Sequence, residues 1–400
     1  MNWSADTATD WPEELRKLAD TLLSSGIDTI DSCAWRDLAD PDAGGSEVHA
    51  DEVFARWAAV GLTIRHRAST HDAPQHLTRR GYQVTRAGGR YGVFPRVIIS
   101  RILRRSPPNV ATVEIWNGVP WFSQLWGHET RSVWLHHIHE DMWKESVPGL
   151  LAPIARFVEV RLAPILYRRT YIATLAVTTK HELLTRGFNE DRIRVAEPGI
   201  DPRYVPDAGR KTDHPTLVAV GRLAPVKRFA DLIDQFADVV RRVPTARLTI
   251  AGDGPDRLLL DAKIEQAGLQ DHVRLAGRVT DDELLEMYQS SWLLVSASHS
   301  EGWGMTITEA AACGTPSVVT RNHGHEAAVG HGRSGIIVDD VHEMADAIVA
   351  LLTDADERRR MSEMARSDAA RYDWDRTAVI LLQMMVDSIP ARQLRDKKSF

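Results

Sequence analysis

The feature that most constrains the fold is a regular alternation of short apolar runs and helical patterns beyond about residue 214. The runs LVAVGRL, RLTIAG, VRLAG, WLLVSAS, PSVVT and GIIVD are continuous and rich in β-branched residues. Runs without polar alternation are typical of strands that are buried on both faces, as in a parallel sheet covered by helices. Strands separated by helices predict βαβ units, and therefore an α/β, doubly wound domain of the Rossmann type.

The first half of the chain repeats this pattern less regularly. AGGSEVHADEVFARWAAVG predicts a Gly-rich turn entering a helix, in which Val53, Phe54, Trp57 and Val60 share one face. LTIRHRAS, VATVEIW and SVWLHH are further expected strands. The expected first strand, DTIDSCAW, is unusually polar for a buried one. We therefore expect a second doubly wound domain here.

The length of the chain and one Pro- and Gly-rich segment indicate two domains. Four hundred residues are too many for one ordinary core. We predict an N-terminal domain over 1–196, with an accessory helix within 1–26 that carries Leu15, Leu18 and Leu22 on one face. Residues 197–215 lack apolar periodicity and are the expected linker. A C-terminal domain follows over 216–375, and 376–400 is a helix expected to cross back to the N-terminal domain.

Composition excludes several classes of protein. A hydrophobic fraction of 43% with 26% charged residues is typical of a soluble globular protein. A net charge of -6 gives no general attraction to nucleic acid, so no nucleic-acid partner is expected. Two cysteines, Cys33 and Cys313, cannot form a disulfide framework, which fits a reducing cytoplasm. We identify no signal peptide and no apolar window long enough to span a membrane.

Two basic and apolar segments raise the question of membrane-surface contact. VFPRVIISRILRR places Val97, Ile98, Arg101, Ile102 and Arg105 within two turns, as an interfacial helix would. The segment 150–169 has a similar composition. The favoured interpretation is a helix packed on its own sheet with its arginines in water. Membrane contact stays an alternative.

The most distinctive string is SHSEGWGMTITEAAACGTP, residues 298–316. It places Glu301 after a strand, Gly302 and Gly304 in a turn, and Glu309 on the following helix. Glycines allow the backbone to approach a ligand, and a helix N-terminus offers N–H groups to phosphate or sugar oxygens. The two carboxylates can each accept hydrogen bonds from a vicinal diol.

A second string, VGRLAPVKRF, places two cations in a loop after a strand. Arg222 and Lys227 are five residues apart, where the loop opens a helix. A diphosphate leaving group gains negative charge as its bond breaks, so fixed cations stabilise that transition state. Arg offers a planar fork and Lys a point charge. A solvated basic loop is the alternative interpretation.

These strings together resemble glycosyltransferase family 4. The first is similar to the family's EGFGxxxxEA followed by CGTP, and the second to VGRLxxxKG, although Arg228 stands where Gly is usual. WRDLADPDAGGSEVHA resembles WRDxxxPxAGGxE, while EIWNGVPWFSQLW and VWLHHIHEDMW resemble a subset with NGxPxF and HHxHxxxW. The resemblance covers about residues 33–388. It implies the GT-B fold, with two Rossmann-like domains facing across a cleft, the N-terminal one binding the acceptor and the C-terminal one the nucleotide sugar.

The resemblance also implies roles for individual residues. Glu301 is expected to contact the transferred sugar and Glu309 the ribose, and in the NGxPxF string Asn117 is expected on the acceptor side. Catalytic roles are expected for His139, Glu301, Arg222 and Lys227, with His136 and His137 as alternatives to His139 on the acceptor side. Further donor contacts are expected from the main chain and side chains of Gly44, Gly45, Arg278, Val279, Gly302, Trp303, Gly304 and Met305.

The reaction implied is a hexosyl transfer that retains anomeric configuration. The donor is a nucleotide diphosphate sugar carrying UDP or GDP, and the leaving diphosphate would accept the acceptor's proton in a front-face mechanism. No metal and no other cofactor are expected. Asp40-Pro41-Asp42 spells a metal-binding DxD, but Asp354-Ala355-Asp356 does so in a helical stretch, and we interpret both as structural.

The acceptor and two other classes of function stay open. The acceptor is an unidentified small molecule, glycan or lipid carrier. A sugar-nucleotide epimerase of the same architecture is one alternative, and a non-catalytic sugar-nucleotide binding protein is another. Incubating the donor alone separates the epimerase from the transferase, because only the epimerase converts the donor.

Overall fold

A computed structural model describes residues 10–70, 73–103, 107–138 and 152–390, and it divides into two compact units. The first unit combines Met1–Gly199 with Trp374–Phe400, and the second is Ile200–Asp373. The chain therefore passes between the units twice. Among the described helices, none is long and apolar enough to cross a membrane.

The first unit contains an eight-stranded sheet in the order β3-β4-β2-β1-β5-β6-β7-β8. All neighbours are parallel except β3 and β4, which form an antiparallel edge. The strands are β1 (Thr29–Cys33), β2 (Thr63–Ala68), β3 (His76–Arg79), β4 (Tyr82–Arg86), β5 (Val110–Asn117), β6 (Arg131–His137), β7 (Tyr171–Thr174) and β8 (Ile193–Val195).

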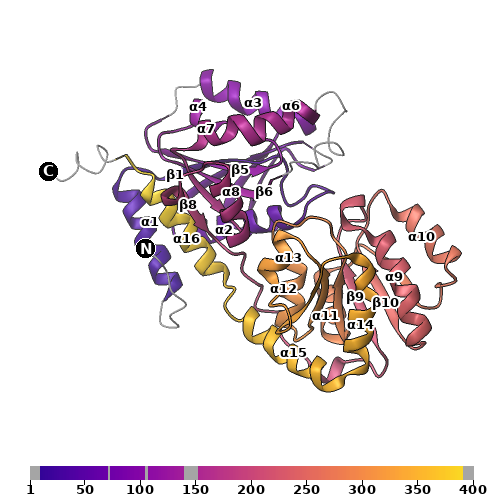
Figure 1. Ribbon diagram of the computed structural model, residues 1–400. Helices are drawn as coiled ribbons and strands as arrows, with labels where there is room; N and C mark the ends of the chain where they lie inside the picture. Colours follow the sequence, from indigo (N-terminus) through magenta and orange to yellow (C-terminus); the bar gives the residue numbers. More distant parts are fainter. Residues whose placement is uncertain (1–9, 71–72, 104–106, 139–151, 391–400) are drawn as a thin grey trace. The chain divides into compact units, whose positions relative to one another are not determined.

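Helices cover both faces of this sheet (Figure 1). One face carries α1 (Trp11–Ser24), α2 (Gly45–Ala59) and α16 (Trp374–Asp387), which share one apolar core with β1, β2, β5 and β6. The opposite face carries α3 (Gly89–Leu103), α4 (Ser123–Trp126), α6 (Ala152–Phe157) and α7 (Ala163–Tyr167), with a π-turn over Val158–Leu162 between α6 and α7. A further helix of this unit is α8 (Val177–Thr185).

Apolar periodicity explains the helices of the first face. Leu15, Leu18 and Leu22 of α1 are buried, as the sequence predicts. In α2, Val53, Phe54 and Trp57 are fully buried, and the Trp57 indole donates to the Ala378 carbonyl of α16 at 3.0 Å. The last helix among the described residues, α16, is therefore part of the core of the first unit.

The polar character of the first strand has a structural cause. Asp31 on β1 is 2% exposed, and its carboxylate accepts hydrogen bonds from Arg65 Nε at 2.7 Å and from Arg65 Nη2 at 3.0 Å. Arg101 of α3 forms an ion pair with the same carboxylate. Because a buried charge is tolerated only when it is paired, these two arginines allow an acidic residue inside the sheet.

The second unit contains a six-stranded parallel sheet in the order β11-β10-β9-β12-β13-β14. The strands are β9 (Thr216–Val220), β10 (Arg247–Ala251), β11 (Val273–Gly277), β12 (Leu293–Ser296), β13 (Ser317–Thr320) and β14 (Gly335–Val338). The helices are α9 (Phe229–Arg242), α10 (Arg257–Gln266), α11 (Asp281–Ser290), α12 (Met305–Ala312), α13 (His323–Ala328), α14 (Met344–Thr353) and α15 (Ala355–Ala369). Each unit is thus an α/β, Rossmann-like domain, as the sequence predicts.

Candidate functional site

The strand order of the second unit creates a switch point beside β9. The chain builds outward from β9 through β10 to β11, then returns to add β12 on its other side. Open α/β sheets bind ligands at such a point, at the carboxyl ends of the strands. The loops after β9 and β12 carry the two most distinctive strings, and the His299 amide joins them by donating to the Val226 carbonyl at 2.9 Å.

Lys227 and Glu301 meet at this point. Lys227 Nζ donates to Glu301 Oε1 at 2.5 Å, and the two side chains are 22% and 18% exposed. Burial acts to raise the pKa of Glu301, but the charges of Lys227 and His325 outweigh it and hold that pKa below its ordinary value. Glu301 is therefore an ionised acceptor beside a cation, partly open to a ligand.

A glycine and a buried histidine support Glu301 from α13. A Cβ on Gly324 would lie 2.6 Å from the Glu301 Cβ, so only glycine lets α13 approach this closely. His325 is fully buried, with Nε2 at 3.2 Å from Ser296 Oγ and Nδ1 at 2.5 Å from the Thr320 carbonyl. No role for His325 was predicted from the sequence. The sequence offered one signal. Asn is a common N-cap residue, and Asn322 caps α13 by accepting a hydrogen bond from the His325 amide.

Glu309 lies on α12 and is held by a tyrosine. Tyr288 donates its hydroxyl to Glu309 Oε2 at 3.0 Å, and Tyr288 itself is fully buried. Burial raises the pKa of Glu309 to about 7, although the hydrogen bond from Tyr288 acts in the opposite direction. The sequence did not identify Tyr288. Glu309 can thus exchange its proton near neutral pH, and one carboxylate oxygen is already engaged.

The other predicted donor contacts of this unit also follow strand ends. Arg222 is exposed directly after β9, and Arg278 is exposed directly after β11, with Val279 half-buried beside it. Gly304 has a φ of 100° and is the N-cap residue before α12, so the amides of Gly302 to Met305 lie at that helix start. Trp303 is only 3% exposed, and its ring packs edge-on against Tyr372 at 5.3 Å, so its side chain belongs to the interior.

Arg228, where the family usually has Gly, keeps the backbone geometry of a glycine. Its φ of 51° is in the left-handed region, directly before α9. A side chain in this conformation is strained, which is why Gly is common at such positions. The Arg228 side chain is retained by Asp231, whose carboxylate accepts from its Nε at 2.6 Å.

In the first unit, a side chain of α2 occupies the amide of the Gly44-Gly45 turn. The Gly44 amide donates to Glu47 Oε2 at 2.7 Å, so the Glu47 side chain caps the start of α2. Arg36 lies 3.6 Å from the other oxygen of Glu47 and donates to the Asp42 carbonyl at 2.8 Å. A phosphate oxygen could take the Gly44 amide only by displacing the Glu47 carboxylate.

The predicted acceptor-side residues lie at the ends of β5 and β6. Asn117 pairs with His137 in the sheet register, and its side-chain amide donates to Ser46 Oγ of α2 at 2.8 Å. His136 is 5% exposed, and its Nε2 lies 3.1 Å from Nδ1 of the buried His49. Burial lowers the pKa of His136 to about 4, so this pair is neutral. His139 lies outside the described residues.

Asp37 of the WRD string is a buried structural residue. Arg86 grips it through two hydrogen bonds of 2.7 Å, and both side chains are fully buried. Arg79 adds a third contact at 3.1 Å. Trp35 donates its indole N–H to the Arg90 carbonyl at 2.7 Å. These residues fix the loop between β1 and α2.

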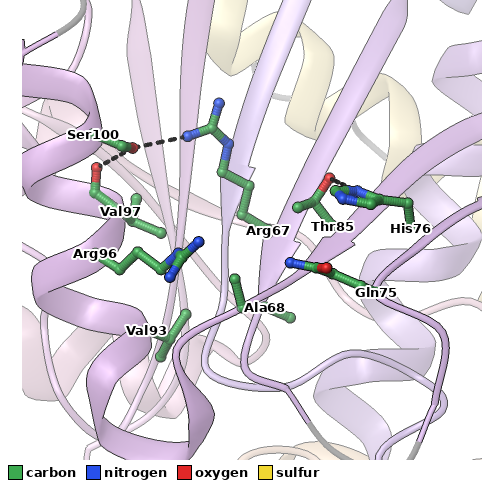
Figure 2. A pocket seen from close by; sticks show the side chains of 10 residues that line it. Arg67, Ala68, Gln75, His76, Thr85, Val93, Arg96, Val97 and Ser100 are labelled. Atoms are coloured by element: carbon green, nitrogen blue, oxygen red, sulfur yellow. Dashed lines mark hydrogen bonds between the residues drawn. The ribbon is translucent and has the colours of Figure 1, made fainter.

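A cavity of about 380 Å³ lies between α3 and the ends of β2 and β4. Figure 2 shows the Arg96 guanidinium and the Gln75 amide pointing into this space. Arg67 lines it too and donates to Ser100 Oγ at 3.2 Å. This cavity was not predicted from the sequence, because its lining comes from β2, β4, α3 and the β3 edge.

No cluster of three or more His, Cys, Asp or Glu side chains suited to a metal ion occurs among the described residues. Asp40 instead accepts a hydrogen bond from the Asp42 amide at 2.8 Å, and Asp354 caps α15. Both Asp-x-Asp strings thus have structural partners.

Comparison with known proteins relates this arrangement to a family. The model of glycosyl transferases group 1 matches residues 202–368. The D-inositol 3-phosphate glycosyltransferase of Corynebacterium urealyticum is 33% identical over 235 residues, which are 52% of this chain and 55% of that relative. The enzyme of that name from Pseudarthrobacter chlorophenolicus is 32% identical over 378 residues, covering 86% of this chain and 90% of its own.

Solved structures support the same fold at lower identity. Sucrose-phosphate synthase from Thermosynechococcus elongatus has a TM-score of 0.73 at 17% identity, covering 92% of this chain and 99% of its own. Anabaena HepE in complex with UDP-glucose has a TM-score of 0.69 at 17% identity, covering 90% and 98%. The chain therefore belongs to the glycosyl transferases group 1, and its two Rossmann-like domains have the GT-B fold.

Proposed function

We propose that the chain is a retaining glycosyltransferase of family 4 type that moves a hexose from a nucleotide diphosphate sugar to an acceptor hydroxyl. The observation that carries this proposal is the Lys227–Glu301 pair at the switch point of the second unit. It places a cation suited to a diphosphate beside a carboxylate suited to sugar hydroxyls. UDP is the favoured nucleotide, because Anabaena HepE was crystallised with UDP and with UDP-glucose.

In this mechanism the cations act on the leaving group. Arg222 and Lys227 bind the diphosphate and stabilise the charge that develops as the bond between the sugar C1 and the phosphate oxygen breaks. Glu301 orients the sugar through its hydroxyls, and Glu309 accepts a hydrogen bond from the ribose. The acceptor oxygen attacks C1 on the face that the diphosphate leaves, and its proton passes to a diphosphate oxygen.

The mechanism needs no metal ion, since Arg222 and Lys227 supply the positive charge. Two further expectations belong to the proposal. The first unit binds the acceptor at the ends of β5 and β6, where Asn117 lies. The reaction takes place in the cytoplasm, which fits two cysteines that are both free and buried.

The acceptor to test first is D-inositol 3-phosphate, because the relatives carry that acceptor in their name. The protein is incubated with UDP-glucose, with and without this acceptor, and the products are followed by nuclear magnetic resonance. A glycoside with the donor's anomeric configuration supports the proposal. Conversion of the donor alone to its epimer would overturn it in favour of an epimerase.

A variant pair links the reaction to the site. Glu301→Gln should abolish most of the transfer, because the sugar hydroxyls lose the carboxylate that accepts their hydrogen bonds. Glu363→Gln, an equal change at an exposed position of α15, is the control and should transfer at the wild-type rate. Donor binding without turnover in wild-type protein, across acidic, neutral and lipid-linked acceptors, would favour the non-catalytic alternative.

A further inference from the structure

The helices on one face of the first unit carry several of the exposed large apolar side chains among the described residues. On α3, Tyr91, Ile99, Ile102 and Leu103 are between 53% and 78% exposed. On α6 and α7, Phe157 and Ile165 are 61% and 62% exposed. Single exposed apolar residues are ordinary, but a group on neighbouring helices marks an interaction surface.

These helices lie together on the same face of the sheet (Figure 1). The segment between β5 and α4 contacts α3 and α7. Phe94 of α3 packs on Trp121 at 4.3 Å, and the Phe122 amide donates to the Tyr167 hydroxyl of α7 at 2.7 Å. The exposed side chains of α3, α6 and α7 therefore belong to one outer surface.

The exposed side chains of α3 are not needed to hold the helix on the sheet. Val93 and Val97 face inward and are 1% and 6% exposed. At 100° per residue along the helix, Ile99 and Ile102 lie on the opposite side, and Leu103 lies on the flank between them and Val93. The sequence is compatible with an interfacial helix or with a helix packed on its sheet. The structure shows a helix with apolar residues on both sides.

The charge of this surface is opposite to that of the whole protein. Residues 89–103 and 152–169 contain six exposed arginines and one glutamate, while the full chain has a net charge of -6; a seventh arginine, Arg101, is paired with Asp31 and does not count toward this surface. The glutamate, Glu159, is 3% exposed. Arg96, Arg161 and Arg168 are exposed. An apolar surface bordered by arginines complements a bilayer whose headgroups are anionic.

We propose that the outer surface of α3, α6 and α7 binds an anionic phospholipid bilayer. Ile99, Ile102, Leu103 and Phe157 enter the boundary between headgroups and acyl chains, while the arginines meet lipid phosphates. Arg96 lies between this apolar strip and the cavity in Figure 2, so the cavity offers a place for one headgroup. The proposal is independent of the donor and acceptor assigned above.

Vesicle co-sedimentation tests it. Full-length protein is mixed with vesicles of phosphatidylcholine alone, or with about one third phosphatidylglycerol. We expect at least about tenfold stronger partitioning onto the anionic vesicles, falling as salt screens the arginines. I102D/L103D should lower that partitioning by more than about tenfold, because two exposed apolar side chains that would enter the bilayer become charged.

Matched variants separate this surface from a general effect. L258D/L259D makes the same double change on exposed α10 of the second unit, where the side chains are 83% and 56% exposed, and should partition as wild type does. R161Q/R168Q should weaken binding to anionic vesicles only, and it keeps the test valid if I102D/L103D misfolds. Circular dichroism reports folding of each variant.

Three outcomes overturn the proposal. One is equal sedimentation of wild-type protein with and without anionic vesicles. Another is binding that neither I102D/L103D nor R161Q/R168Q reduces. The third is a lipid-free dimer, seen by light scattering, that I102D/L103D dissociates, because it assigns the surface to a second copy of the chain. UDP-glucose turnover, measured in parallel without lipid, reports on the proposed function separately.

Discussion

The two units use their charged residues in different ways. In the second unit, Lys227, Glu301 and Glu309 gather at strand ends, where each is held by one main partner and stays partly open. In the first unit, the carboxylates of Asp31, Asp37 and Glu114 are almost fully buried among several partners. The comparison indicates that charged side chains at the strand ends of the second unit stay open to a ligand, whereas the buried carboxylates of the first unit hold its interior together.

The largest expected effect tests the bracing. Asp37→Ala should lower the free energy of unfolding by about 3–5 kcal/mol, because it leaves Arg86 buried without its partner. Urea unfolding measures this change. Asp387→Ala is the control, since it removes a half-exposed partner of Arg194 and should change stability by less than about 1 kcal/mol. A fully stable Asp37→Ala protein with lost transfer would instead make Asp37 a site residue.

The next effect tests the binding site. Arg222→Ala should reduce kcat/KM by about 2–4 kcal/mol of transition-state stabilisation, roughly 30- to 1000-fold, with little change in stability. Steady-state kinetics with the donor and acceptor measure it. Arg274→Ala, at another exposed arginine of the same unit, should stay within about twofold of wild type. Wild-type turnover in Arg222→Ala would remove Arg222 from the mechanism.

A smaller effect is the pH dependence of stability that Glu309 contributes. Its pKa is about 7 in the folded unit, above the ordinary value of 4.5, so the folded state holds this proton more tightly. Stability from this group is therefore present below about pH 4.5 and is lost as the pH rises towards 7. Melting temperatures of wild type and Glu309→Gln should diverge over this range. Glu363→Gln should follow wild type, and a parallel course for Glu309→Gln would contradict the assignment.

The smallest expected effect is that of metal removal. EDTA should leave the transfer rate within about twofold, because the diphosphate is neutralised by Arg222 and Lys227. The rate is measured after dialysis against EDTA and again after adding Mg²⁺ or Mn²⁺. A loss restored by either ion would show that these cations alone do not neutralise the leaving group.

The sequence predicted the architecture well because buried parallel strands leave a clear record. The six apolar runs of the second half correspond to β9–β14, and the strings at their ends meet through Lys227 and Glu301. Strand ends of a parallel sheet lie at one edge, so proximity follows from topology. Tyr288 and His325 were missed because they support the site from the interior, where a polar residue looks like any other.

The first unit was harder to predict because its partners are distant in sequence. Asp31 can be buried because Arg65 of β2 and Arg101 of α3 pair with it. These partners are distant in sequence, so no local pattern predicts the ion pairs. The sequence did not show which face of the sheet His136 would point to. In the structure it points toward α2, where its ring contacts His49. The roles assigned to Asn117, His137 and the Gly44-Gly45 turn stay predictions.

The position of α16 has a consequence for the order in which the protein is made. Trp374–Asp387 completes the core of the first unit, yet the ribosome translates it after all of Ile200–Asp373. The second unit can fold on emerging, whereas the first must wait with Trp57 and Trp134 incompletely covered until the last helix appears. A nascent chain stopped before Trp374 should therefore bind chaperones through its N-terminal segment, Met1–Gly199.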